Sequence, residues 1–474
     1  MRLTRRGAVA GVAAAAVVLA GGCTSGDGEA PPEPARSFAP GAAGAGDPYF
    51  PGYGNGGYDV ASYDLKLGYD PATDELSGTA TVTATALADL SQFNLDLAGL
   101  DVSRVTINGV AGSRTRAEGN ELIVTPPTGL PKDREFVAEI TYAGKPGQLG
   151  TAALGQGGWL HTGDGAIALG EPESASTWFP VNDHPSDKAA FRLEITVPEG
   201  LEALSNGVPG ERSTAGGSTT WRWEEKTPMA PYLATLVIGQ YRVETGTHKG
   251  RPVVTAIPES LPADGPAARS MAETTRIADH LETVFGPYPV DAYGGVVVTD
   301  QRISYALETQ SRPVYGNTFF RGGENLSVVA HELAHQWFGD SVSVRQWKDI
   351  WLNEGFATYA EWLWSEHEGE ATAQQRFTDT YAGFDWSVPT GDPGQANLFG
   401  PAVYQRGGMT VHALRRTVGD EDFFAILKAW TAEKRNGNAA TAEFVTLAER
   451  VSGESLRTMF DAWLFGTTAP PVPR

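Results

Sequence analysis

Residues 329–359 read VAHELAHQWFGDSVSVRQWKDIWLNEGFATY and contain a His-Glu-x-x-His motif, HELAH, at positions 331–335. Eighteen residues separate His335, the second histidine of the motif, from Glu354. Residues four apart on a helix share one face and lie about 6 Å apart along the axis. That separation suits His331 and His335 to bind one metal ion together.

The stretch also contains a third ligand and a base. Catalytic zinc takes three protein ligands and leaves the fourth position to water. Glu354, which begins the next helical pattern, is the candidate for the third ligand. Glu332 is rotated by about 100° around the helix from His331, so it can reach that water without ligating the metal. We predict one zinc ion per chain on His331, His335 and Glu354, with Glu332 as general base.

Composition and charge limit the partners. The chain has 474 residues, of which 41% are hydrophobic, so it can form more than one core and two domains are expected. Its formal net charge of −21 repels nucleic acid and anionic lipid headgroups. We therefore expect no nucleic-acid partner, and the oligomeric state stays open.

The N-terminus predicts an exported lipoprotein. A basic start at 1–6 and an apolar run at 7–20 precede Gly21-Gly22-Cys23, the layout of a signal that ends at a lipoprotein cleavage site. We expect a signal peptide over 1–22 and a lipid on Cys23, which would anchor the protein to the extracytoplasmic side of the cell membrane. Ordinary secretion with an incidental thiol is the alternative, and the Sec and twin-arginine export routes both stay open.

Three further segments follow this signal. Residues 23–51 are rich in Gly, Ala and Pro and predict a disordered tether. Residues 52–243 alternate apolar and polar side chains over short runs, with turn signals such as Asn108-Gly109, and predict antiparallel strands. Residues 244–474 have mostly helical patterns around one short apolar strand at 293–298. The fold class is therefore α+β with two domains.

The helices expected in the second domain include the metal helix and the helix that carries Glu354. Their predicted ranges are 267–285, 325–338, 347–364, 371–381, 402–418, 421–433, 442–451 and 455–464. Asp349 has two interpretations, a carboxylate that orients a metal-binding histidine and a simple acid at a helix start.

Several separated motifs resemble the zinc aminopeptidase family that includes membrane alanyl aminopeptidase, bacterial aminopeptidase N and leukotriene hydrolase. The resemblance covers about 58–470. It is carried by HELAHQWFGD at 331–340, WKDIWLNEGFATYAEWL at 347–363, Glu171-Pro172 with Trp178-Phe179-Pro180, Thr227-Pro228-Met229 with Tyr232-Leu233, and VYQRGG at 403–408. It implies a β-sandwich-like domain followed by a thermolysin-like catalytic domain with a small mixed sheet.

The resemblance also implies roles for residues outside the metal stretch. Tyr404 would donate a hydrogen bond to the oxyanion. Glu308, in the loop Tyr305-Ala306-Leu307-Glu308-Thr309, would pair with the free α-ammonium group of a peptide, with Glu171 as a second acid and Ala306 at the same substrate site. An acid that faces a cation in a cleft is physically sensible, because an unpaired buried charge is costly.

The chain departs from the family pattern in three respects. Tyr305, Leu307 and Thr309 replace the Gly, Met and Asn of the family loop. Leu169 stands where many relatives have a glutamine. The C-terminal domains that cover the cleft in most relatives have no counterpart after about Pro470, so we expect a more open cleft.

The function predicted from the sequence is an extracytoplasmic zinc aminopeptidase that acts on peptides with a free N-terminus. One alternative is a zinc endopeptidase or another zinc hydrolase of this family, which the altered loop favours. The other is a non-catalytic surface lipoprotein, against which the complete set of ligands, base and tyrosine argues.

Overall fold

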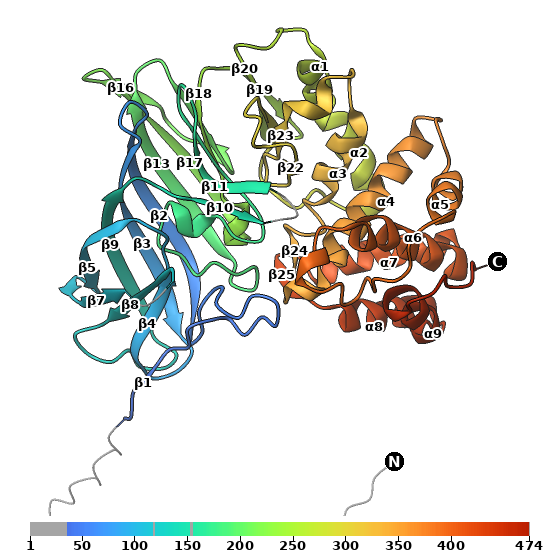
Figure 1. Ribbon diagram of the computed structural model, residues 1–474, viewed down its shortest axis with the longest axis horizontal. Coiled ribbons are helices and arrows are strands. Elements are labelled where there is room, and N and C mark those ends of the chain that lie inside the picture. The colour runs from blue at the N-terminus through green and yellow to red at the C-terminus, as the bar shows by residue number, and fades with distance from the viewer. Residues whose placement is uncertain (1–35, 117–118, 152–154, 474) are drawn as a thin grey trace, which may run out of the picture. The chain divides into compact units, whose positions relative to one another are not determined.

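The structure is a computed structural model that describes residues 36–116, 119–151 and 155–473. Residues from Phe38 onward form one compact unit, in which a β-rich half is followed along the chain by a mostly helical half (Figure 1). This is the predicted two-domain α+β fold. The predicted signal peptide and Cys23 lie outside the described residues.

The β-rich half contains three sheets. The largest has nine strands in the order β15-β17-β13-β2-β3-β9-β5-β6, with β16 paired to β17, and the others have the orders β1-β4-β8-β7 and β10-β11-β12-β18-β14. The strands of the largest sheet are β2 (Tyr58–Asp70), β3 (Glu75–Ala86), β5 (Asp101–Ile107), β6 (Val110–Ala111), β9 (Glu135–Gly144), β13 (Ala189–Pro198), β15 (Val208–Pro209), β16 (Ser213–Ala215) and β17 (Ser218–Met229). Those of the smaller sheets are β1 (Ala39–Pro40), β4 (Leu90–Asp96), β7 (Ser113–Arg116), β8 (Glu121–Thr125), β10 (Gln148–Thr151), β11 (Gly155–His161), β12 (Ala166–Leu169), β14 (Glu202–Ser205) and β18 (Leu236–Gly239).

The period-two pattern of the sequence explains these strands. Along β2, Tyr63, Leu65 and Leu67 are buried, whereas Lys66 between them is exposed, as expected of a strand that buries one face. Most pairings are antiparallel as predicted. The pairings of β2 with β13 and of β1 with β4 are parallel, so the sheets are mixed in part.

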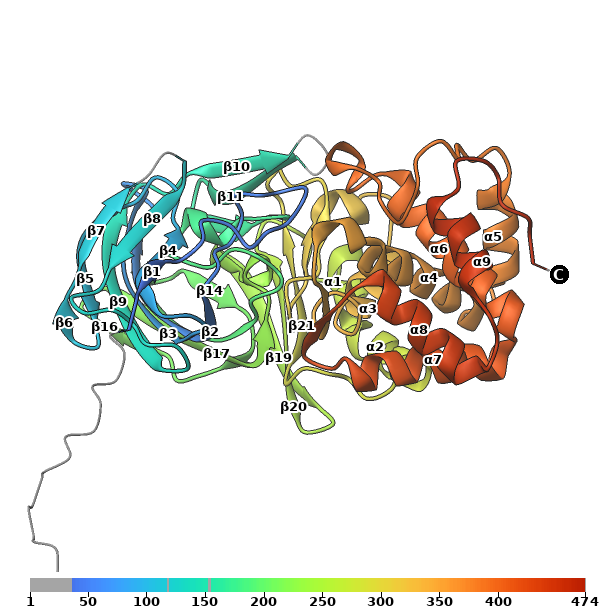
Figure 2. The ribbon, with the colours of Figure 1, turned by 90° about the horizontal axis from the view of Figure 1, so that it is seen from below.

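The helical half contains a smaller mixed sheet with the order β19-β20-β21-β23-β22. Its strands are β19 (Tyr241–His248), β20 (Arg251–Pro258), β21 (Tyr293–Val298), β22 (Ala306–Leu307) and β23 (Val314–Gly316), and a separate parallel pair joins β24 (Val342–Val344) to β25 (Gly437–Ala439). The predicted domain boundary after Val243 falls inside β19. In Figure 2 this sheet lies between the β-rich half and the helices.

The helices follow the predicted order with shifted ends. They are α1 (Pro266–Ala272), α2 (Thr274–Phe285), α3 (Leu326–Ala334), α4 (Trp351–His367), α5 (Ala373–Tyr381), α6 (Pro401–Val418), α7 (Asp420–Glu433), α8 (Thr441–Ser452) and α9 (Arg457–Phe460), which continues into a π-helical turn, Asp461–Phe465. The expected helix over 267–285 is divided at Glu273 into α1 and α2. The metal helix α3 starts after Asn325, whose side chain accepts a hydrogen bond from the Val328 amide and caps the helix.

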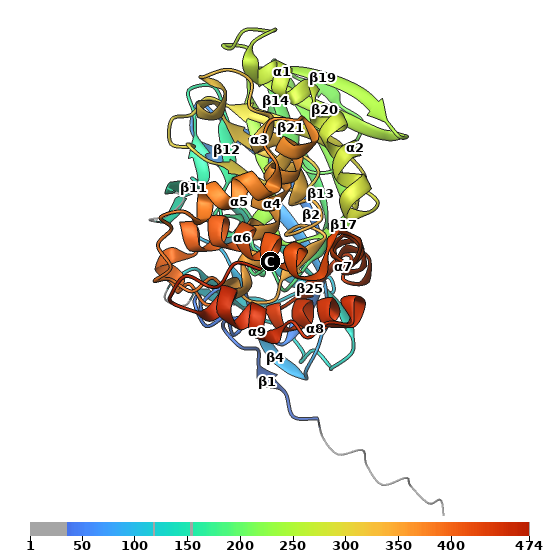
Figure 3. The same ribbon diagram turned by 90° about the vertical axis from the view of Figure 1, so that its right-hand side faces the viewer.

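Helix α4 packs against both α3 and α6 (Figure 3). The contact between α4 and α6 is unusually close at Gly355 and Gly407, because a Cβ built on Gly407 would lie 2.7 Å from the Cα of Gly355. Glu354 and Tyr404 lie beside this crossing on their respective helices. The absence of side chains at the two glycines therefore lets both functional candidates approach one pocket.

The prediction of a disordered tether is wrong for residues 38–51, which pack against the rest of the unit. Asp47 and Phe50 are buried. The Asp47 carboxylate accepts hydrogen bonds from the backbone amides of Trp347, Tyr49 and Phe50. The composition resembles that of a disordered linker, but a few specific contacts are enough to order the segment. The rest of the predicted tether lies outside the described residues, apart from Arg36 and Ser37.

No helix within the described ranges is long and apolar enough to cross a membrane.

Candidate functional site

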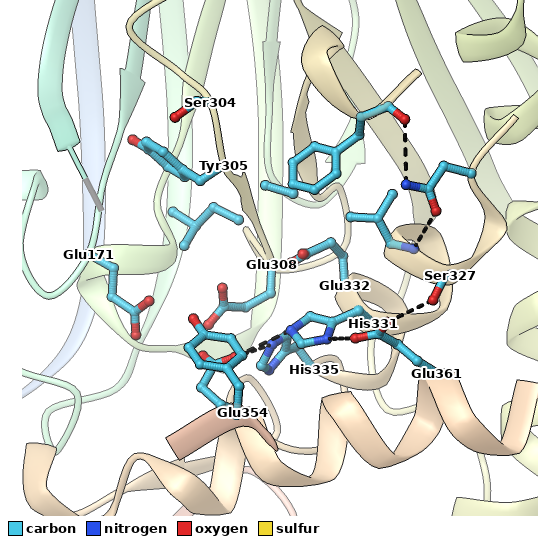
Figure 4. Close-up of a pocket in the computed structure, with 16 residues that line it drawn as sticks. Glu171, Ser304, Tyr305, Glu308, Ser327, His331, Glu332, His335, Glu354 and Glu361 are labelled. Atoms are coloured by element: carbon cyan, nitrogen blue, oxygen red, sulfur yellow. Dashed lines mark hydrogen bonds and ion pairs between the residues drawn. The ribbon is translucent and has the colours of Figure 1, made fainter. Parts of the chain in front are cut away.

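The three predicted zinc ligands meet at the junction of α3 and α4. The Nε2 atoms of His331 and His335 lie 3.3 Å and 3.4 Å from Oε2 of Glu354. One ligand atom from each residue lies within 4.8 Å of the others. All three side chains line one pocket (Figure 4). One turn of α3 and the first turn of α4 are thus enough to gather the set.

Hydrogen bonds to the other ring nitrogens orient both histidines. Nδ1 of His331 lies 2.7 Å from Oε1 of Glu361, and Nδ1 of His335 lies 2.9 Å from the carbonyl oxygen of Phe338. Metal-binding histidines usually donate their second ring N–H in this way, which leaves Nε2 free to bind the metal. Both Nε2 atoms face Glu354.

Glu361 was not identified from the sequence, although it lies two helical turns after Glu354 and on the same face of α4. It also accepts a hydrogen bond from the Ser327 hydroxyl. Asp349 accepts instead from the amide and hydroxyl of Thr441, at the start of α8. The histidine-orienting interpretation of Asp349 is therefore wrong, and Asp349 is a structural acid at a helix start.

The donor set fits a zinc ion. Burial raises the pKa of Glu354, but His335 and His331 more than offset this and lower its pKa to about 2, so the carboxylate is ionised. Two imidazoles with available Nε2 atoms and one ionised carboxylate form a common ligand set for catalytic zinc. No lysine or arginine lines the pocket among the described residues, so no side-chain cation competes for these ligands.

Glu332 lies on α3 between the two histidines and lines the same pocket. Its carboxylate lies within 4.8 Å of ligand atoms of Glu308 and His335. Burial raises the pKa of Glu332 to about 8, an effect that His331 and His335 oppose and that Glu308 and Glu354 reinforce. The geometry therefore places a carboxyl group beside the ligands and outside the ligand set.

Glu171 and Glu308 form a second acidic group at one end of the pocket. Carboxylate oxygens of Glu171, Glu308 and Glu354 lie within 4.8 Å of one another. Both residues are buried, and Oε1 of Glu171 has no hydrogen-bond partner among the described residues. Burial, followed by the charge of Glu308, raises the pKa of Glu171 well above its usual value. Such a group of buried acids favours the binding of a cationic ligand.

Tyr404 closes another side of the pocket. Its ring stacks on that of His331, with centroids 6.0 Å apart and an interplanar angle of 16°. No described residue hydrogen-bonds its hydroxyl. Burial, followed by the charge of Glu354, raises the pKa of Tyr404 well above its usual value. The phenol is therefore protonated and available to donate to a ligand.

The altered loop still brings Ala306 and Glu308 to the pocket. Ala306 lies in β22, the edge strand of the small sheet, where it pairs with Tyr315. An edge strand has free backbone groups that can bind an extended peptide. Tyr305 lines the pocket, and its hydroxyl donates a hydrogen bond to the carbonyl of Gln156, 3.0 Å away. Leu169 does not line the pocket; it is buried in β12.

The pocket has a volume of about 410 Å³. In Figure 4, Glu171 and Tyr305 lie at one end, Ser327 and Glu361 at the other, and His331 and Glu332 between them. A ligand that placed a cation at Glu171 and Glu308 would therefore extend across the metal ligands toward the N-terminal turn of α3.

Comparisons with known proteins agree with this geometry. Residues 60–233 match the Peptidase M1 N-terminal domain, and residues 283–463 match the Peptidase family M1 domain. The solved structure of an M1 zinc metallopeptidase from Deinococcus radiodurans is 32% identical, with a TM-score of 0.84 over 91% of this chain and 99% of that one. A mutant of that protein has been solved with a Tyr-Ser-Ala substrate bound.

Curated relatives match in sequence as well. Aminopeptidase M1 of Arabidopsis thaliana is 27% identical over 85% of this chain and 49% of its own length. Aminopeptidase N of Lactococcus lactis is 28% identical over 60% of this chain and 37% of its own length. The chain thus spans about half the length, or less, of these relatives.

Proposed function

The chain belongs to peptidase family M1, a family of zinc metallopeptidases, and we propose that it is a zinc-dependent aminopeptidase that removes N-terminal residues from peptides. The observation that carries this proposal is the position of Glu171 and Glu308. Their buried carboxylates lie within 4.8 Å of a carboxylate oxygen of Glu354, one of the zinc ligands.

That distance supports a substrate with a free N-terminus. The α-nitrogen and the carbonyl carbon of one residue are separated by only two covalent bonds, each about 1.5 Å long. An α-ammonium group bound by Glu171 and Glu308 therefore places the first peptide carbonyl beside the metal ligands. A blocked N-terminus has no charge to offset the buried carboxylates, which favours an exopeptidase over an endopeptidase.

His331, His335 and Glu354 would hold the zinc ion, which supplies Lewis-acid chemistry: it polarises a carbonyl oxygen and makes water a better nucleophile at neutral pH. Glu332 accepts the proton of the attacking water and delivers it to the leaving amine. The Tyr404 hydroxyl donates a hydrogen bond to the oxyanion that develops on the carbonyl oxygen. Glu171 and Glu308 bind the α-ammonium group and hold the carbonyl of the first residue beside the metal ligands.

The decisive experiment compares aminoacyl reporter substrates with their N-acetylated counterparts, with and without a chelator. We expect rapid release of the reporter group from substrates with a free N-terminus and release at least about 100-fold slower from N-acetylated substrates. The chelator should abolish both activities. Equal turnover of free and N-acetylated substrates would support the endopeptidase alternative instead. A purified protein with no bound zinc and no turnover would support the non-catalytic alternative.

We further propose that the protein is anchored outside the cytoplasm by a lipid on Cys23. The basic start, apolar run and Gly21-Gly22-Cys23 sequence support this proposal. Replacement of Cys23 by Ser should abolish incorporation of labelled fatty acid and release the enzyme from the membrane fraction. Unchanged membrane association of Cys23→Ser would reject the anchor, and wild-type protein in the medium without lipid would favour ordinary secretion.

A further inference from the structure

Tyr232 connects the β-rich half to the amine-binding end of the pocket. It lies in a 3-10 turn, Pro231–Leu233, between β17 and β18, and is fully buried. Its hydroxyl donates a hydrogen bond to Oε1 of Glu308 at 2.9 Å. Tyr232 does not line the pocket itself, and its hydrogen bond to the pocket is the one to Glu308.

The position of the phenol is itself constrained. The Tyr232 ring packs edge-on against Trp347, with ring centroids 5.4 Å apart. Trp347 lies just before α4, and its backbone amide donates to Asp47. The hydroxyl therefore has a well-defined location, set by packing between segments that are far apart in the sequence.

Glu308 needs such a fixed partner. Its backbone carbonyl accepts a hydrogen bond from Nε2 of Gln336, but among the described residues Tyr232 is the only one whose side chain hydrogen-bonds its carboxylate. Oxygens of Glu171 and Glu354 lie within 4.8 Å and repel the carboxylate when all are ionised. One hydrogen bond to Oε1 holds the side chain against this repulsion and leaves Oε2 for a ligand.

We propose that Tyr232 is a positioning residue that aims the Glu308 carboxylate at the α-ammonium group of the substrate. The β-rich half would then contribute to amine recognition twice, through Glu171 directly and through Tyr232 by way of Glu308. This inference rests on the proposed aminopeptidase function. A tyrosine at the end of the β-rich half would in this way affect substrate binding in the helical half.

The test uses Tyr232→Phe in the zinc-loaded, full-length enzyme, with Tyr142→Phe as the matched control. Tyr142 is also a fully buried tyrosine, but it lies on β9 and its hydroxyl has no hydrogen-bond partner within the described part of the chain. For Tyr232→Phe we expect KM for free aminoacyl substrates to rise about tenfold, the size expected for a hydrogen bond to a charged group, with kcat changed less than about threefold. The zinc content and the slow turnover of N-acetylated substrates should stay unchanged.

Three outcomes separate positioning from a merely structural role. A KM in Tyr232→Phe equal to that of Tyr142→Phe overturns the proposal. An equal loss of activity on free and N-acetylated substrates also overturns it, because the effect would then not concern the amine. In the Glu308→Gln background, adding Tyr232→Phe should produce no further rise in KM, and an additive effect contradicts action through Glu308.

Failure of the proposed function gives a different pattern. If Glu308→Gln leaves KM and the discrimination against N-acetylated substrates unchanged, the aminopeptidase assignment fails first. If Glu308→Gln raises KM and Tyr232→Phe does not, only the positioning role fails. Should Tyr232→Phe not fold, 3-fluorotyrosine at position 232 keeps the shape and changes the donor strength. An unchanged KM in that protein overturns the proposal.

Discussion

The metal centre and the amine-binding group are adjacent in space but differ in how the chain builds them. His331, Glu332, His335 and Glu354 come from 24 consecutive residues on two neighbouring helices. Glu171, Tyr232 and Glu308 come from the β-rich half and from the edge of the small sheet. The zinc ligands and the base are therefore encoded locally, whereas Tyr404 comes from α6. In the proposed function, the recognition of a free N-terminus depends on packing between the two halves.

The largest effect should come from Glu332→Gln. Without its proton acceptor the enzyme should lose about 10³-fold in kcat or more, while the zinc content stays at one ion per chain. Rapid kinetics and metal analysis on the same preparation measure both quantities. Wild-type turnover with zinc bound would contradict the role of Glu332 as the base.

Glu361→Gln should weaken zinc binding by about 10- to 100-fold, because His331 would lose the carboxylate that orients its ring. Competition with a chromogenic chelator measures the affinity. Asp349→Asn is the matched control and should leave zinc affinity unchanged, since the Asp349 carboxylate hydrogen-bonds Thr441 and none of the three metal ligands. If the two variants exchanged these effects, the assignment of the orienting carboxylate would be reversed.

Gly407→Ala should force α4 and α6 apart, because the added Cβ would lie 2.7 Å from the Cα of Gly355. We expect a loss of about 1–3 kcal/mol in the free energy of unfolding and a fall in kcat from misplacement of Tyr404. Denaturant unfolding and steady-state kinetics measure the two effects. Gly246→Ala, whose Cβ would meet nothing within 4 Å, should change neither of them much.

The last effect concerns Asp187, in the segment between Glu171 and β13, and is a dependence of stability on pH. Burial raises the pKa of Asp187 to about 8, whereas its unfolded value lies near 3.8. Between pH 3.8 and pH 8 the folded state retains this proton and the unfolded state releases it. The contribution of Asp187 to the free energy of unfolding is therefore fully present below pH 3.8 and is lost as the pH rises to 8. Within this range the free energy of unfolding falls by up to about 1.4 kcal/mol per pH unit.

Asp187→Asn removes this titration and keeps an oxygen that can accept from the Val60 amide. Unfolding measured from pH 4 to pH 8 should therefore show a steeper loss of stability in the wild type than in the variant. Parallel pH profiles would show that Asp187 is ionised in the folded protein.

The sequence was sufficient for the fold class and for the arrangement of the metal stretch because both depend on short periodic patterns. Alternation along β2 and four-residue spacing along α3 specify which side chains share a face. Helix ends were less predictable, since Asn325 caps α3 through a specific side-chain contact and α1 and α2 divide at Glu273. The ordered conformation of residues 38–51 depends on the hydrogen bond between Asp47 and Trp347, which the composition of the segment does not reveal.

Local spacing along one or two helices thus specifies the zinc ligands, the base and the chemistry they allow. It does not specify which carboxylate orients His331. Asp349, just before α4, and Glu361, within α4, are both acids close to the metal stretch. Nor does local spacing show that Tyr232 reaches Glu308, 76 residues further along the chain. The first relation arises when α4 packs against α3, and the second when the two halves pack, since hydrogen bonds form between atoms that are close in space regardless of their separation in sequence.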